Sequence, residues 1–220
     1  MTQRLVYFMG PSGAGKDSLL DWLRAQLPGH LPLRWARRTI SRPMDPGGEA
    51  HESVTPPEFT ALREAAAFAL HWEANGLCYG IRHEELSPQM AGGWVLLNGS
   101  RAYLPQALER FPQMNAVHIT ASPEVLRRRL LARGRESADQ VEARVQRALA
   151  FQVPAGVAGI AVHNNGALDD AGRELLKALS QLPGWPDGNG TLAPPRPLPP
   201  LAADSIHSLQ PRAAAQPTLP

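Results

Sequence analysis

A glycine-rich turn directly after a short apolar run constrains the fold of this chain more than any other feature of its sequence. Residues 5–9 read Leu-Val-Tyr-Phe-Met, and residues 10–17 read Gly-Pro-Ser-Gly-Ala-Gly-Lys-Asp. The apolar run predicts a buried strand, and the pattern over residues 16–27 predicts a helix that ends where Pro28 and Gly29 follow. A strand, a Gly-x-x-x-x-Gly-Lys turn and a helix in this order predict a phosphate-binding loop.

The spacing within this loop has a direct chemical interpretation. Gly13 and Gly15 let the backbone wrap closely around a phosphate, so that several N–H groups point at it. The N-terminus of the following helix adds partial positive charge, and Lys16 can reach the β- and γ-phosphates of a nucleotide. A purely structural glycine turn is the alternative, but it would not require the lysine. The residues expected to bind ATP are Gly10, Pro11, Ser12, Gly13, Ala14, Gly15, Lys16 and Asp17.

The loop departs from the usual pattern at its last position, where Asp17 replaces Ser or Thr. A carboxylate is a hard oxygen ligand that suits Mg²⁺, so we expect Asp17 to hold the metal that accompanies the nucleotide. The alternative is that Asp17 only stabilises the N-terminus of the helix and that the adjacent Ser18 takes the metal role.

Apolar runs and helical patterns alternate over residues 1–182. Expected strands are 5–9, 33–39, 94–98, 116–120 and 159–163, and expected helices are 16–27, 57–66, 103–110, 123–133, 138–151 and 169–182. Continuous apolar strands between helices predict a parallel sheet covered on both faces, which is an α/β fold. The interval from about residue 42 to residue 80 breaks this rhythm with Pro/Gly-rich sequence, and we expect an inserted subdomain there.

The last part of the chain has a different composition. Residues 183–220 hold 10 of the 22 prolines, with four charged residues and one aromatic residue. Such a segment has little to bury against its ordering entropy, so we expect a disordered tail. A Pro-rich ligand for an adaptor domain is the alternative.

Charge and cysteine content exclude several classes of protein. The formal net charge of +2 is too small to indicate a nucleic-acid or membrane partner. The single cysteine, Cys78, excludes an intramolecular disulfide framework and a Cys-rich zinc site, and it fits a reducing cytosol. The first apolar run is too short for a signal peptide, and no stretch approaches the length of a membrane span. We therefore expect a cytoplasmic protein.

Several segments together resemble the guanylate kinase family over residues 4–180. Residues 39–43 with Gly48-Glu49 are similar to that family's acceptor segment, Tyr79-Gly80 to its Tyr-Gly pair, and residues 122–144 to its arginine-rich lid. The resemblance implies a P-loop NTPase with a parallel five-stranded sheet flanked by helices. It also implies an acceptor-binding subdomain over about 42–80 and a lid over about 123–150.

Departures from the family concern the acceptor base. The position of the guanine-reading Glu falls at Leu70, and the base-contacting residue after Tyr-Gly is Ile81. The position of the family's phosphate-contacting Tyr falls near His51. Asn98-Gly-Ser stands where the family has an Asp-x-Asp segment. A site that reads a base by hydrogen bonds loses that base when its polar groups become alkyl. This combination, with Asp17, resembles the ribose 1,5-bisphosphate phosphokinases of phosphonate utilisation.

That resemblance implies transfer of the γ-phosphoryl group of ATP to the 1-phosphate of ribose 1,5-bisphosphate, giving 5-phosphoribosyl 1-diphosphate (PRPP) and ADP. The attacking oxygen is already anionic, so positioning and charge cancellation matter more than a general base. All of the 22 basic residues except Lys16 and Lys177 are arginines, which grip phosphates bidentately. The alternatives are a guanylate or other nucleoside-monophosphate kinase, and a kinase-like binding module without catalysis.

The same resemblance assigns roles to individual residues. The implied catalytic residues are Lys16, Arg133 and Arg144, and the implied substrate-binding residues are Arg42, Glu49, His51, Tyr79 and Arg101. Arg37 and Arg38 also flank the expected acceptor subdomain, and Arg129 and Arg135 lie in the expected lid.

Overall fold

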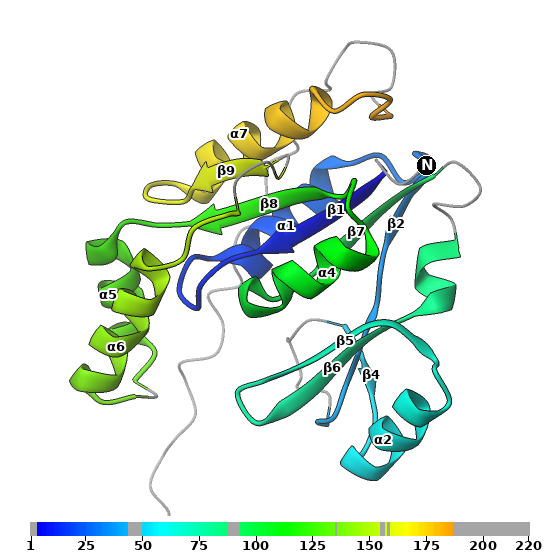
Figure 1. The fold of residues 1–220 in the computed structure, drawn as a ribbon. Helices are drawn as coiled ribbons and strands as arrows, with labels where there is room; N and C mark the ends of the chain where they lie inside the picture. The colour runs from blue at the N-terminus through cyan, green and yellow to red at the C-terminus, as the bar shows by residue number, and fades with distance from the viewer. Residues whose placement is uncertain are drawn as a thin grey trace, which may run out of the picture.

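A computed structural model of the chain describes residues 4–43, 50–87, 93–134, 136–154, 157 and 159–186. Its centre is a five-stranded parallel sheet in the order β2-β7-β1-β8-β9 (Figure 1). The strands are β1 (Leu5–Met9), β2 (Leu33–Trp35), β7 (Trp94–Asn98), β8 (Asn115–Thr120) and β9 (Gly159–His163). The predicted α/β class and parallel five-stranded sheet are confirmed.

Both faces of the parallel sheet are buried, as its apolar strands require. Successive side chains of β1 point to opposite faces: Val6 and Phe8 join one hydrophobic cluster, and the alternate residues of the strand join the other. The first cluster is covered by α1 (Lys16–Gln26), α5 (Pro123–Ala132), α6 (Ala138–Leu149) and α7 (Leu168–Ser180). The second is covered by α4 (Leu104–Arg110) and by the second sheet.

The second sheet has four strands in the order β4-β3-β6-β5. These are β3 (Arg38–Ile40), β4 (Glu52–Ser53), β5 (Phe68–Ala74) and β6 (Leu77–Arg82), followed by the 3₁₀ helix η1 (His83–Leu86). Strands β5 and β6 form an antiparallel hairpin around Asn75 and Gly76, which both have positive φ. Helix α2 (Pro56–Glu64) begins with a capping box between Thr55 and Glu58. This sheet and α2 form the subdomain that interrupts the α/β rhythm.

The single strand predicted over residues 33–39 is wrong, because the chain divides it between the two sheets. Strand β2 ends at Trp35, and β3 begins three residues later. The carboxylate of Glu85, which is 3% exposed, accepts hydrogen bonds from the Arg34 guanidinium at 2.9 Å and the Arg37 backbone N–H at 3.2 Å. A buried carboxylate with these donors ties the junction to η1, a contact that local sequence cannot reveal.

All six predicted helices form, and the packed chain extends slightly past its expected end at residue 182. Trp185 is 6% exposed and packs edge-on against Trp94, with the two ring centroids 4.9 Å apart. The Trp94 indole N–H donates to the Gly184 carbonyl at 2.8 Å. Residues 187–220, most of the expected tail, lie outside the described residues. Within the part of the chain that the structure describes, no helix is long and apolar enough to cross a membrane.

The contact between α7 and α1 makes a stability prediction. A Cβ at Gly172 would lie 2.4 Å from the Trp22 ring, whose indole N–H donates to Asp169 at 3.0 Å. We expect Gly172→Ala to lower the free energy of unfolding by about 1–2 kcal/mol, because overpacking outweighs the gain in helix propensity. Urea denaturation would measure the change. A matched Gly166→Ala variant, where a Cβ meets no atom within 4 Å, should stay close to wild type, and equal stabilities for the two variants would contradict the packing argument.

Candidate active site

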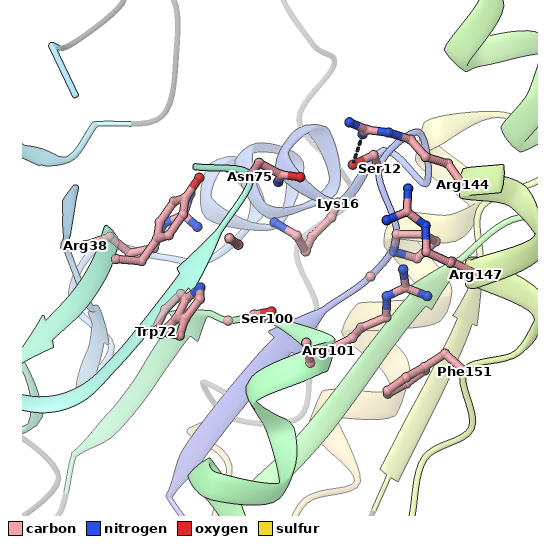
Figure 2. A pocket seen from close by; sticks show the side chains of 16 residues that line it. Ser12, Lys16, Arg38, Trp72, Asn75, Ser100, Arg101, Arg144, Arg147 and Phe151 are labelled. Atoms are coloured by element: carbon pink, nitrogen blue, oxygen red, sulfur yellow. Dashed lines mark hydrogen bonds between the residues drawn. The ribbon is translucent and has the colours of Figure 1, made fainter. Parts of the chain in front are cut away.

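A cleft of about 490 Å³ lies where the phosphate loop, α6 and the β5–β6 hairpin meet (Figure 2). It lies beyond the carboxyl ends of β1 and β7, where parallel sheets place their ligands. None of its described lining residues is acidic. The basic side chains in its lining are Lys16, Arg38, Arg101, Arg144 and Arg147. A cleft with this lining suits a ligand that carries several negative charges.

The phosphate loop has the backbone geometry that its glycines predict. Gly13 and Gly15 adopt φ values of 89° and 78°, which a residue with a Cβ rarely adopts. Asn164, which follows β9, donates to the Ala14 carbonyl at 2.8 Å. Arg129 of α5 donates to the Gly13 and Ala14 carbonyls at 3.4 and 3.5 Å. The Ala14 N–H donates to the Pro11 carbonyl at 3.2 Å, so the loop is held by contacts of its own backbone as well as by these side chains. A loop of this shape can direct its other N–H groups at a phosphate.

Lys16, Asp17 and Asn98 form one hydrogen-bonded group beside the cleft, and Lys16 is the member that lines it. The Lys16 ammonium donates to an Asp17 oxygen at 2.7 Å and to the Asn98 side-chain oxygen, and the Asn98 amide donates to Asp17 at 3.1 Å. Burial raises the pKa of Asp17, but Lys16, Arg38 and Asn98 together hold it below its ordinary value. Asp17 is therefore a carboxylate at neutral pH.

This group fits a magnesium ion that arrives with a nucleotide. Mg²⁺ is usually held by one or two carboxylates together with substrate phosphates and water. Asp17 provides one carboxylate beside the phosphate loop, next to Lys16. Among the described residues, no cluster of three His, Cys, Asp or Glu could hold a metal by itself. Ser18 is the second candidate ligand, and it is exposed on the first turn of α1.

The two predicted catalytic arginines of the lid lie in different places. Arg144 of α6 lines the cleft, donates to the Ser12 hydroxyl at 3.0 Å and forms an ion pair with Glu136. Arg133 caps the C-terminus of α5, is exposed and is not part of the cleft lining. Arg135 lies outside the described residues. Of the two predicted arginines, Arg144 is the one that lies in the described lining of the cleft.

The end of β7 is held in a tight turn that places Arg101 in the cleft. Tyr7 donates its hydroxyl to the Ser100 carbonyl and accepts the Ser100 N–H, both at 2.8 Å. A Cβ at Gly99 would lie 2.1 Å from the Tyr7 ring, so only glycine permits this approach. The short helix η2 (Arg101–Tyr103) follows at once, and Arg101 lines the cleft as predicted.

The acceptor side of the cleft is a wall of stacked aromatic rings. Trp72 stacks on Tyr79 at 5.6 Å and on Tyr103 at 5.5 Å, and the Arg38 guanidinium lies 5.2 Å from the Tyr79 ring centroid. Tyr79 thus lies in the cleft as predicted, together with Arg38. Such stacked rings present an apolar wall with a single cation over it.

Two predicted substrate-binding residues do not line this cleft, and a third lies outside the described residues. Arg42 lines a separate cavity of about 220 Å³ with Thr55 and Glu58, and its carbonyl accepts the Ser53 hydroxyl at 2.6 Å. His51 is buried at 2% exposure, with its Nε2 3.5 Å from the same carbonyl. Glu49 lies outside the described residues.

Leu70 and Ile81, the two positions compared with base-reading residues, face away from the cleft. They are paired across β5 and β6, and both are 0% exposed. Their side chains pack in the hydrophobic cluster beneath the second sheet. The structure therefore offers no polar group at either position to read a purine.

Several lining residues were not among the predicted site residues. Arg147 lies one helical turn after Arg144, so helical periodicity alone would have placed the two on one face. Trp72 and Phe151 come from segments far apart in sequence, and only tertiary packing brings them to the cleft. Two further residues contact the lining residues or the loop without lining the cleft themselves. Arg129 donates to the loop carbonyls, and Asn98 accepts from Lys16.

Comparison with known proteins identifies close relatives. No protein-family model matches the chain. It is 49% identical over 180 residues to a ribose 1,5-bisphosphate phosphokinase PhnN of Burkholderia pseudomallei, covering 82% of this chain and 97% of the relative. The identically named protein of Pseudomonas paraeruginosa is 50% identical over 182 residues, covering 81% and 96%. That of Agrobacterium fabrum is 42% identical over 180 residues, covering 82% and 98%.

A solved structure supports the fold. The guanylate kinase of Anaplasma phagocytophilum matches with a TM-score of 0.57 over 80% of this chain and 84% of that one. At 18% sequence identity this likeness shows the shared fold alone, which is the P-loop α/β architecture described above.

The group around Asp17 makes a prediction about magnesium. We expect Asp17→Asn to raise the magnesium concentration needed for half-maximal ATP binding about tenfold, because the amide lacks the charge of the carboxylate. Calorimetric titration of ATP at graded magnesium concentrations would measure this. Ser18→Ala is the matched variant and should match wild type. An increase in Ser18→Ala with none in Asp17→Asn would instead assign the metal to the serine.

Proposed function

The chain belongs to the ribose 1,5-bisphosphate phosphokinase family, and on that premise we propose that it transfers the γ-phosphoryl group of ATP to the 1-phosphate of ribose 1,5-bisphosphate. The products are 5-phosphoribosyl 1-diphosphate and ADP, and the reaction is a step in phosphonate catabolism. The observation that carries this function is the cleft itself, whose described lining residues include five cations and no carboxylate. Both substrates bring phosphates to one place, and that lining can offset their charge.

The reaction needs positioning rather than proton removal. An oxygen of the 1-phosphate, already anionic, attacks the γ-phosphorus and forms the new P–O bond. The bond from that phosphorus to the bridging oxygen of the β-phosphate breaks, and ADP leaves with the electron pair. Because no proton has to move, the absence of an acidic side chain from the described lining is consistent with this chemistry.

The residues on the donor side hold the transferred group. The N–H groups of the phosphate loop and the Lys16 ammonium bind the β- and γ-phosphates, while Arg144 reaches over the loop beside Ser12. When Mg²⁺ is bound with ATP, it neutralises charge on the β- and γ-phosphates, and Asp17 with Asn98 is the group that would hold it.

The acceptor side is assigned to residues that line the cleft. Arg38 of β3 and Tyr79 of β6 line the cleft together with the phosphate loop. From this position they can hold the reacting 1-phosphate. Arg101 binds the acceptor from the other side of the cleft. Arg42 and His51 lie outside the cleft, and we propose that they stabilise the second sheet. The Arg42 carbonyl accepts the Ser53 hydroxyl, and His51 is buried.

A guanylate kinase activity has less support. The base-reading positions Leu70 and Ile81 are buried, and stacked Trp72 and Tyr79 occupy the acceptor wall. A purine there would lose its hydrogen bonds to water without gaining a hydrogen-bonding partner at either position.

We also propose a cytoplasmic location, which the single cysteine supports.

A direct assay separates the two acceptors. With ATP and Mg²⁺, we expect ADP formation with ribose 1,5-bisphosphate and at least about 100-fold lower kcat/KM with GMP, because one unpaired hydrogen-bonding site already costs this much. A coupled spectrophotometric assay measures ADP, and ³¹P NMR identifies the diphosphate product. Turnover of GMP without turnover of the sugar bisphosphate would overturn the proposal, and ADP with neither acceptor would revive a non-catalytic binding module.

The chain contains its own control for the role of the loop lysine. We expect Lys16→Ala to lower kcat by about 100- to 1000-fold, because it removes a cation from the transferred phosphoryl group. The other lysine, Lys177, is exposed in the last turn of α7, and Lys177→Ala should leave kcat unchanged. Thermal unfolding should stay within a few degrees of wild type for both. Equal kcat values in the two variants would remove Lys16 from the mechanism.

A further inference from the structure

Two arginines from different parts of the fold lie near each other in one corner of the cleft. Arg101 comes from η2 at the carboxyl end of β7, and Arg147 comes from α6. Figure 2 shows both guanidinium groups directed into the cleft, with Arg144 nearer to Ser12 and Phe151 beneath Arg101. The Arg101 guanidinium lies 5.2 Å from the centroid of the Phe151 ring.

The hydrogen-bonding capacity of this pair is largely unused. The Nη1 atom of Arg101 is buried and has no hydrogen-bond partner. Arg147 donates its Nε to the Ala143 carbonyl of its own helix at 3.3 Å. Neither arginine forms an ion pair with an acidic residue in the described ranges. Burial, followed by the nearby charge of Arg147, lowers the pKa of Arg101, so a bound anion at this position would stabilise the charged guanidinium.

The floor of this corner is apolar and neutral. His118 of β8 packs edge-on against Phe151 at 5.1 Å, and its Nε2 is buried. Burial, followed by the charges of Arg101 and His163, lowers the pKa of His118 to about 4, so its ring is neutral at pH 7. A floor of this kind adds no charge and keeps water away, which strengthens contacts between the arginines and a bound anion.

We propose that Arg101 and Arg147 form a subsite for the 5-phosphate of the acceptor, the phosphate that does not react. This inference rests on the function proposed above. The reacting 1-phosphate has to meet the γ-phosphate where Lys16, Ser12 and Arg144 gather. The second phosphate, at the other end of the sugar, then lies against Arg101 and Arg147. A phosphate dianion satisfies the unused donors of both guanidinium groups.

This subsite would also couple acceptor binding to the lid. Arg101 is fixed to the parallel sheet through the Tyr7–Ser100 turn, whereas Arg147 belongs to α6 of the lid. A phosphate held by both arginines bridges the sheet and the lid and holds Arg144, on the same helix, over the phosphate loop. An acceptor without the 5-phosphate leaves the pair unsatisfied, and the enzyme should reject it for that reason.

Substrate truncation combined with mutation tests the subsite. In wild type, we expect kcat/KM to fall at least about 100-fold from ribose 1,5-bisphosphate to ribose 1-phosphate, because a phosphate held by two arginines makes several charge-assisted hydrogen bonds. In Arg101→Gln and Arg147→Gln this ratio should shrink to about tenfold or less, with kcat/KM for ribose 1-phosphate nearly unchanged. Arg128→Gln removes an exposed arginine from the same lid and should keep the wild-type ratio.

A binding experiment gives a readout that is independent of turnover. Ribose 5-phosphate carries only the non-reacting phosphate, and calorimetry should show its Kd rising at least about tenfold in both subsite variants and not in Arg128→Gln. Unchanged binding together with an unchanged truncation ratio would overturn the subsite. Equal losses with ribose 1-phosphate and ribose 1,5-bisphosphate would also overturn it, because they would indicate a structural role.

The outcomes separate this inference from the proposed function. A wild-type enzyme that turns over neither sugar phosphate refutes the function. One that turns over both with the same kcat/KM supports the function and refutes the subsite. If Arg101→Gln does not fold, Arg147→Gln decides the question, because that side chain is exposed on α6.

Discussion

The orientation of the phosphate loop is the constraint on which the rest of the site depends. Its backbone turns through two glycines with positive φ, and its carbonyls are held by Asn164 from beyond β9 and by Arg129 from α5. A Cβ at Gly15 would lie 2.4 Å from the Asn164 amide, so the glycine and its partner are mutually required. This arrangement turns the N–H groups toward the ligand, and it also links the loop to the last strand and to the lid.

Electrostatics then decides what the cleft can hold. The near-neutral net charge of +2 conceals a local excess, because the described cleft lining contains five basic and no acidic side chains. The acids near the cleft are already engaged: Asp17 with Lys16 and Asn98, and Glu136 with Arg144. Such a cleft is costly when empty and favourable when phosphates fill it, which suits a reaction between two phosphorylated substrates.

Acceptor choice follows from packing as much as from charge. The positions that would read a base are turned into the core as the Leu70–Ile81 pair, and Trp72 closes the wall by stacking on Tyr79. The architecture is shared with a guanylate kinase structure, at a TM-score of 0.57. A shared fold does not fix the acceptor, and we propose that side chains on the second sheet and on α6 distinguish a sugar bisphosphate from a nucleotide.

The sequence by itself determined the parallel sheet, the six helices, the phosphate loop and the family, because each depends on local periodicity or on a contiguous motif. It also placed Lys16, Tyr79, Arg101 and Arg144 in the cleft. It misassigned the segment 33–39 as one strand, whose division between two sheets involves a contact with Glu85. Arg42 and His51, which it predicted to bind substrate, lie outside the described lining of the cleft. Only the tertiary structure brought Trp72 of β5 into one cleft with Arg147 of α6 and with Phe151, which follows that helix. Long-range packing decides such contacts, and no local pattern in the chain encodes them.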